Sequence, residues 1–165
     1  MKASAVGKMS AEAKRAYLAG LVDGDGCIMA TIERHSEKKF GFRVRVEFKI
    51  TQKDDKLLKD LVREFKIGCV SRNRRKSDIN YSTHDWIVRT KADVSFILEY
   101  IKPYVQTKNK QIDIALKILQ RTIVKHGDLM KNARLADTLS KYNVRSKNRK
   151  KNFSTMIKTL ISPND

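Results

Sequence analysis

The sequence predicts an α+β fold whose elements follow in the order α-β-β-α-β-β-α, with extra helices after them. Residues 27–35 and 42–51 carry an apolar side chain at every second position, which is typical of half-buried strands. A polar connection of hairpin size joins these two segments. Residues 54–65 instead repeat their apolar side chains at helical spacing. The 165 residues are enough for a domain with its own core.

The first expected helix covers residues 10–22 and leads directly into a stretch of glycines and aspartates. Gly24 and Gly26 are expected to break this helix, because glycine tolerates the backbone angles that end one. The break would leave Asp23 and Asp25 at the helix C-terminus, where the helix dipole disfavours anions. A carboxylate in that position is more easily explained by a bound cation than by helix stability.

The remaining elements follow from the same two periodicities. Strands are expected at residues 69–73 and 81–89, and the alternation in the second strand turns Trp86 and Val88 toward the core. The helices expected after these strands cover residues 92–101, 108–124, 129–141 and 153–161.

Charge is the strongest feature of the composition. The chain has 36 Lys and Arg against 18 Asp and Glu, a formal net charge of +18. A domain this basic usually binds a polyanion, most often nucleic acid, although a merely solvated basic surface is the alternative. No apolar run approaches the about 18 residues that a membrane span needs, so no membrane partner is expected.

Two cysteines, Cys27 and Cys69, form no paired motif, which fits an intracellular, reducing compartment, whether an archaeal or bacterial cytoplasm or an organelle. Together with His35 or His84 they could in principle bind zinc, but their spacing matches no common zinc site.

One domain is expected for the whole chain, residues 1–165, because no internal repeat or low-complexity block divides it. Residues 1–9 are expected to form an N-terminal tail. Residues 142–165 are expected to form a basic loop followed by an amphipathic C-terminal helix. A charge run is usually a solvated linker, but a helix follows this one, and its cations are expected to bind phosphates: Arg145, Lys147, Arg149 and Lys150.

The stretch Leu-Ala-Gly-Leu-Val-Asp-Gly-Asp-Gly at residues 18–26 resembles the signature of the LAGLIDADG homing endonucleases. Val22 and Gly24 are mild variants of that signature, and the other positions match it. The resemblance implies the homing endonuclease fold with a four-stranded antiparallel DNA-binding sheet. It also implies a site-specific DNA endonuclease that makes a metal-dependent double-strand break in a long pseudo-palindromic target.

The resemblance implies roles for particular residues. Asp25 would ligate the metal, together with the backbone oxygen of Gly24. Gln52, which ends the second expected strand, would order the water network. Lys56 would lie near the scissile phosphate, and Lys108 would help to stabilise charge in the active site. Without the resemblance, Gln52 is read as a strand cap and the two lysines as ordinary surface residues.

The residues alone also favour a metal. The three histidines are scattered and offer no obvious base. Mg²⁺ prefers one or two carboxylates, backbone oxygens and water, and metal ions activate water and stabilise developing charge in phosphodiester hydrolysis. We therefore expect Mg²⁺ or another divalent cation such as Mn²⁺.

A homodimer is expected because one copy of the signature offers too few carboxylates to cut two strands. Ala16 and Gly20 stand four residues apart on the first helix, and Ala19 lies beside them, so a second backbone could approach closely. If two helices pack there about a two-fold axis, their Asp25 side chains meet. The expected interface residues are Ala16, Ala19, Gly20 and Asp23.

The polar faces of the strands are expected to read bases in double-stranded DNA. An ordinary solvated sheet face is the alternative, but the net charge favours nucleic acid, and a twisted two-stranded ribbon can enter the major groove. The expected contacts are Met29, Thr31, Glu33, His35, Arg43, Arg45, Glu47, Lys49, Ser71, Asn73, Thr83, Asp85 and Ile87.

Two other functions on the same fold remain open. A maturase would bind intron RNA and assist splicing, and a non-cleaving relative would only bind DNA. The joint presence of Asp25, Gln52, Lys56 and Lys108 favours cleavage, since a protein that does not cut has no need of all four.

Overall fold

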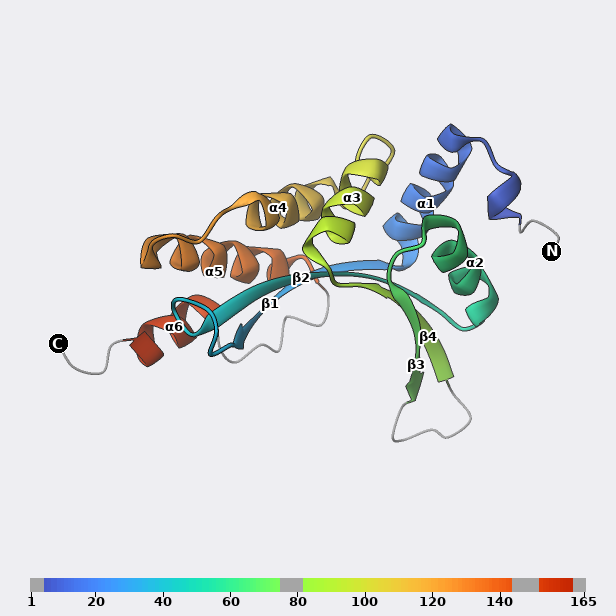
Figure 1. Cartoon of the computed structure of the whole chain (residues 1–165). Helices are drawn as coiled ribbons and strands as arrows, with labels where there is room; N and C mark the ends of the chain where they lie inside the picture. The colour runs from blue at the N-terminus through green and yellow to red at the C-terminus, as the bar shows by residue number, and fades with distance from the viewer. Residues whose placement is uncertain (1–4, 75–81, 144–151, 162–165) are drawn as a thin grey trace. The chain divides into compact units, whose positions relative to one another are not determined.

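The computed structural model describes residues 5–74, 82–143 and 152–161 (Figure 1). The chain divides into two compact units. The first unit comprises Met1–Cys27 and Glu47–Asn109, and the second unit comprises Ile28–Val46 and Lys110–Asp165. The expectation of one domain for the whole chain stays a prediction.

Helices and strands follow in the predicted order, and the α+β prediction is confirmed. The four strands form one sheet in the order β1-β2-β4-β3, and β4 pairs antiparallel with both β2 and β3. Within the described residues no helix is long and apolar enough to cross a membrane. In chain order the elements are η1 (Val6–Lys8), α1 (Ala11–Asp25), β1 (Gly26–Arg34), β2 (Phe42–Gln52), α2 (Asp55–Phe65), β3 (Cys69–Arg74), β4 (Ser82–Val88), α3 (Lys91–Ile101), α4 (Asn109–Gln120), α5 (His126–Lys141) and α6 (Phe153–Ile161).

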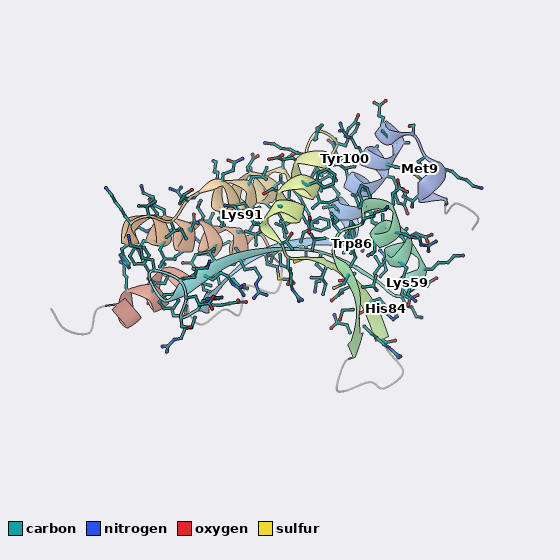
Figure 2. The ribbon with its side chains drawn as sticks, in the orientation of Figure 1. Met9, Lys59, His84, Trp86, Lys91 and Tyr100 are labelled. Carbon is teal, nitrogen blue, oxygen red and sulfur yellow. The ribbon has the colours of Figure 1, made fainter. Side chains whose placement is uncertain are left out.

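In the first unit, an aromatic cluster that includes side chains of α2 and α3 is built on Trp86. Figure 1 shows α2 alongside β3 and β4, and α3 alongside α1. Trp86 and Val88 are fully buried, as the alternation predicted. The Trp86 ring stacks on Phe65 at 6.0 Å, and its indole Nε1 donates to the carbonyl oxygen of Ile67 at 3.0 Å. Phe65 also meets Tyr100 of α3 edge-on at 5.5 Å (Figure 2 labels Trp86 and Tyr100).

Gly68 makes the turn from α2 into β3 possible. Its φ is +69°, in the left-handed region that side chains disfavour. A Cβ atom there would also overlap the backbone oxygen of Ile87 and lie 2.7 Å from Trp86 Nε1. Both the backbone angle and the close approach of β4 therefore require glycine.

The second unit has its own apolar cluster, in which α5 and α6 pack against each other. Ile32 and Phe42 contribute from the strands, Leu129 and Ala133 from α5, and Ile157 from α6. The N-terminus of α6 is capped from α5, because the carboxylate of Asp137 accepts hydrogen bonds from the first two backbone N–H groups of α6 at 2.7 and 3.0 Å.

The first helix differs from its prediction at its C-terminal end. Ser10 caps α1 by accepting from the backbone N–H of Ala13 at 3.2 Å. The helix does not break at Gly24, however, but continues to Asp25. The helix ends at Gly26, where the chain turns into β1. A Cβ atom at this position would lie 2.6 Å from the backbone oxygen of Val22, so the turn requires glycine. The break prediction was therefore right for Gly26 and wrong for Gly24.

Other element boundaries also differ from their predictions, and the helix expected at residues 108–124 ends at Gln120. The expected tail at residues 1–9 contains η1, which packs against α2 and buries Val6 to 3% exposure. The helix expected at residues 129–141 begins earlier, at His126. Asp128 accounts for this start, since its carboxylate accepts from the backbone N–H of Lys125 at 2.9 Å.

Candidate active site

The C-terminal end of α1 lies beside the end of β2. There Gln52 Nε2 donates a hydrogen bond to Asp25 Oδ2 at 2.7 Å. Asp25 is exposed, while Gln52 is half-buried. Asp25 is the last residue of α1 and Gln52 is the last residue of β2, so the two side chains lie where the helix and the strand end. The structure thus brings together two of the four residues that the resemblance singled out.

Lys108 lies at the same helix end. Its Nζ donates to the backbone carbonyl oxygen of Asp23 at 2.8 Å, and its side chain is half-buried. The C-terminal carbonyls of a helix carry partial negative charge, which favours an ammonium group there. Lys108 precedes α4 directly, so the loop before α4 decides where this ammonium lies.

Asp23 holds that loop. Its carboxylate accepts from the backbone N–H of Gln106 at 2.7 Å, and from the backbone N–H and hydroxyl of Thr107 at 3.0 and 2.8 Å. Sequence reasoning missed Gln106 and Thr107, and the only signal was a polar pair directly before Lys108. The carboxylate of Asp23 is therefore committed to the loop of its own chain.

The pKa of Asp23 reflects this arrangement. Burial, the largest single influence, raises the pKa, but the hydrogen bonds from Gln106 and Thr107 together outweigh it and lower the pKa below the ordinary value. Asp23 is therefore ionised at neutral pH and acts as an acceptor for three donors.

Lys56 lies apart from this group. It is exposed in the first turn of α2, where its backbone N–H donates to Asp54 Oδ1 at 2.9 Å. Among the described residues no contact joins its side chain to Asp25, Gln52 or Lys108. The catalytic role expected for Lys56 stays a prediction.

One chain offers a small set of ligands for a metal ion at this site. Asp25 is an exposed carboxylate at the negative end of α1, where a cation would offset the unfavourable helix dipole. In the described part of the chain, no three His, Cys, Asp or Glu side chains gather into a metal-binding group. One carboxylate with the backbone oxygen of Gly24 suits Mg²⁺, which keeps most of its waters, and does not suit a zinc site built from side chains.

Two of the expected interface residues lie on an open surface of α1. Ala16 and Gly20 are exposed, and a Cβ at Gly20 would meet nothing within 4 Å. The placement of Ala19 at an interface was wrong, because Ala19 is 0% exposed and packs into the core of its own unit. One helical residue rotates the side chain by about 100°, which turns Ala19 inward while Gly20 points outward. Asp23 is half-buried and engaged by its own loop.

On the first unit, the polar sheet face is only partly available to a ligand. Ser71 and Asn73 are exposed, whereas Glu47, Lys49 and Thr83 are half-buried. Glu47 also forms an ion pair with Arg89. These residues lie on the strands where the alternation placed them, and their contacts with DNA stay predictions.

Asp85 and Ile87 were wrongly expected to contact bases. They are only 4% and 8% exposed, because β4 is a central strand and its neighbours cover it. Lys49 on β2 and Cys69 on β3 lie directly opposite Ile87, and Lys49 also forms an ion pair with Asp85 at 3.3 Å.

On the second unit, one carboxylate organises two arginines. Glu33 Oε2 accepts from Arg43 NH2 at 2.8 Å and also pairs with Arg45. The hydrogen bond from Arg43 is the main reason why the pKa of Glu33 is lowered, and the charges of both arginines add to it. Met29 and His35 are half-buried and Thr31 is exposed. The predicted phosphate contacts Arg145, Lys147, Arg149 and Lys150 lie outside the described residues.

Comparison with known proteins places this geometry in a family. The family model described as LAGLIDADG endonuclease matches residues 18–119. DNA endonuclease I-CreI of Chlamydomonas reinhardtii is 35% identical over 107 residues, which cover 64% of this chain and 61% of that protein. DNA endonuclease I-CvuI of Chlorella vulgaris is 29% identical over 110 residues, or 66% of this chain and 65% of that protein. The matched region thus spans slightly less than two thirds of each curated relative.

Solved structures agree with this result. The crystal structure of the homing endonuclease I-CvuI in complex with its target, in the presence of Ca, covers 90% of this chain and 92% of that chain with a TM-score of 0.72 at 25% identity. The archaeal intron-encoded homing endonuclease I-Vdi141I, complexed with DNA, shares the fold with a TM-score of 0.72 at 17% identity, over 91% of this chain and 98% of that chain. The signature helix, the sheet topology and the family match together show that this chain belongs to the LAGLIDADG endonuclease family.

Proposed function

We propose that the chain is a site-specific DNA endonuclease that acts as a homodimer and makes a metal-dependent double-strand break in a long pseudo-palindromic target. The observation that carries the proposal is the 2.7 Å hydrogen bond between Gln52 and Asp25 at the exposed end of α1. Lys108 at the same helix end and the formal net charge of +18 support it. The names of I-CreI and I-CvuI as DNA endonucleases agree with it.

In the proposed reaction, Asp25 and the backbone oxygen of Gly24 would hold Mg²⁺ or Mn²⁺. When bound, such an ion activates water and stabilises the charge that develops on the phosphate. Gln52 fixes the orientation of the Asp25 carboxylate through one amide N–H, and its other N–H and its carbonyl oxygen stay available to orient water.

Lys108 would supply positive charge to the developing phosphate oxyanion. An ammonium group has three N–H donors, and the Asp23 carbonyl accepts only one of them. The other two can donate to a phosphate oxygen, and such pre-oriented donors stabilise transition-state charge. Lys56 is proposed to neutralise a phosphate from the exposed start of α2.

Two glycines on the exposed side of α1 support the homodimer. Glycine inside a helix costs about 1 kcal/mol relative to alanine. A Cβ at Gly20 or Gly24 would meet nothing within 4 Å, so the fold of one chain does not require glycine at either position. A second α1 that packs against this surface would require it. A mass corresponding to one chain per DNA duplex in light scattering would refute the dimer.

The test is cleavage and binding by Asp25→Asn, measured on a duplex selected from a randomised library by the wild-type chain. We expect this variant to lose cleavage below detection while its affinity in a gel shift stays within about threefold, because the removed charge lies at the helix end. Asp60→Asn is the matched control, since it removes a carboxylate that pairs with Arg63 on α2. Equal cleavage by Asp25→Asn and wild type would refute the proposal.

The same experiment separates the alternatives. A wild-type chain that binds a selected duplex but never cuts it with Mg²⁺ would be a non-cleaving DNA-binding protein. A chain that selects no duplex but binds intron RNA would be a maturase.

A further inference from the structure

Asp85 is the one carboxylate among the described residues that is buried, with 4% exposure. It lies on β4, on the polar face of the sheet, opposite to the face that carries Trp86. Burying a carboxylate is unfavourable unless donors surround it, so its partners have to be accounted for.

Two hydrogen bonds and one ion pair from the two flanking strands satisfy Asp85. The hydroxyl of Thr51 donates to Oδ1 at 2.7 Å from the position directly opposite on β2. The amide Nδ2 of Asn73 on β3 donates to Oδ2 at 2.6 Å. Lys49 Nζ lies 3.3 Å from the same oxygen. Thr51 and Asn73 therefore each direct one donor toward the buried carboxylate, and Lys49 adds an ion pair.

This arrangement decides what the three partners present to a ligand. An ionised carboxylate only accepts hydrogen bonds, so the proton of the Thr51 hydroxyl is committed to it, and Thr51 presents lone pairs alone. Only the NH₂ end of an amide can face a carboxylate, so the amide of Asn73 cannot flip. Its carbonyl oxygen and one N–H remain available, which is the pair that recognises adenine in the major groove. Lys49 presents N–H donors beside these two side chains.

We propose that Asp85 is a positioning residue for sequence readout. It contacts no base, and its buried carboxylate fixes the hydrogen-bond polarity of Thr51 and Asn73, as an acceptor and an oriented amide, while its ion pair with Lys49 places that ammonium group beside them. The inference rests on the proposed function, because it takes duplex DNA to be the ligand of this sheet face. It also adds Thr51, which was absent from the expected contacts, to the residues that read bases.

The test compares base preferences of full-length variants on randomised duplexes, scored by binding in Ca²⁺ and by cleavage in Mg²⁺. The variants Thr51→Val and Asn73→Ala first identify the base pairs that these two side chains read. A wrong base there should reduce the wild-type signal by about 10- to 100-fold. In Asp85→Asn the same base changes should alter the signal by less than about threefold, because the new amide can donate as well as accept and lets Thr51 and Asn73 invert. Preferences elsewhere in the target should be unchanged.

Two controls separate this role from a general loss of structure. Asp60→Asn removes an equal charge from the Asp60–Arg63 pair of α2 and should keep the wild-type preferences. Thr51→Val leaves Asp85 in place to hold Asn73, so it should lose preference at the Thr51 position and keep it at the Asn73 position. This second result applies even where Asp85→Asn does not fold.

The possible outcomes are distinct. A wild-type chain with no duplex preference in either assay overturns the proposed function and this inference together. A clear wild-type preference that Asp85→Asn retains at the Thr51 and Asn73 positions overturns the role of Asp85 alone. Loss of preference at both positions in Thr51→Val also overturns it.

Discussion

The loop that presents Lys108 depends on the carboxylate of Asp23, and the substitution Asp23→Asn tests this dependence. Asparagine keeps the shape but replaces one acceptor oxygen by an NH₂ group, which faces the donors of Gln106 or Thr107. At least one of the three hydrogen bonds is then lost. A hydrogen bond to a charged group contributes about 1.5–3 kcal/mol, and the site is only half-buried, so we expect a loss of about 1–2 kcal/mol in the free energy of unfolding at pH 7.

The same substitution should slow cleavage without weakening DNA binding. The ammonium of Lys108 keeps its bond to the backbone oxygen of Asp23 but loses the loop that restrains its other motions. If the full 1–2 kcal/mol is lost from positioning in the transition state, the single-turnover rate falls by about 5- to 30-fold. Affinity should change by less than about twofold, because neither residue belongs to the sheet face.

The stability difference should also depend on pH. Hydrogen bonds hold the pKa of Asp23 below its usual value despite the opposing effect of burial. A depressed pKa in the folded state stabilises the protein above the unfolded pKa of about 3.9, and this contribution is lost as the pH falls through the folded value. Wild type and Asp23→Asn should therefore differ in urea unfolding at pH 7 and converge in acid.

A matched control is Asp128→Asn. Asp128 likewise accepts from two backbone N–H groups, those of Val124 and Lys125 at 3.2 and 2.9 Å, and these hydrogen bonds lower its pKa. Asp128→Asn should lose some stability and keep the wild-type cleavage rate. If Asp23→Asn is destabilised but cleaves at the wild-type rate, the loop does not position Lys108 for the reaction.

Three further substitutions test other parts of the chain. Asp137→Ala removes the cap of α6, and amide hydrogen exchange in α6 should accelerate by about tenfold, whereas unchanged exchange would show that the cap does not hold the helix. Gly68→Ala should lower the free energy of unfolding in urea by about 3 kcal/mol or more, since both its φ of +69° and the contact with β4 exclude a side chain. Glu33→Gln releases Arg43 and Arg45, so the non-specific affinity for DNA should rise. The slope of log affinity against log salt concentration should steepen by about one in a salt titration by fluorescence anisotropy. An unchanged slope would contradict the inference that Glu33 withholds these arginines from phosphates.

The order of helices and strands could be predicted because it depends on local periodicity. The alternation around Trp86 and Val88 indicated correctly which side chains are buried. Element ends were less predictable, since they depend on single hydrogen bonds. The carboxylate of Asp128 starts α5 at His126, and the close approach of Val22 ends α1 at Gly26.

For the candidate site, the resemblance named Asp25 and Gln52 but predicted no hydrogen bond between them. The structure shows that they meet because Asp25 ends the signature helix and Gln52 ends the neighbouring strand. The bond between Asp23 and Thr107 spans 84 residues, and no local pattern around either residue indicates that they meet. The different roles of Asp23, which binds the loop, and Asp25, which is exposed, could therefore be seen only in the structure.

The two corrections on β4 have a common cause. Alternation predicts the face on which a side chain lies, but it does not predict whether neighbouring strands cover it. Asp85 and Ile87 lie on the polar face of a central strand, where Lys49 from β2 is long enough to cover both. Covered and paired in this way, the carboxylate of Asp85 need not repel a DNA backbone, because the ammonium of Lys49 compensates its charge. A carboxylate on a sheet face that is proposed to bind DNA is thus better explained by the side chains it holds than by a base it contacts.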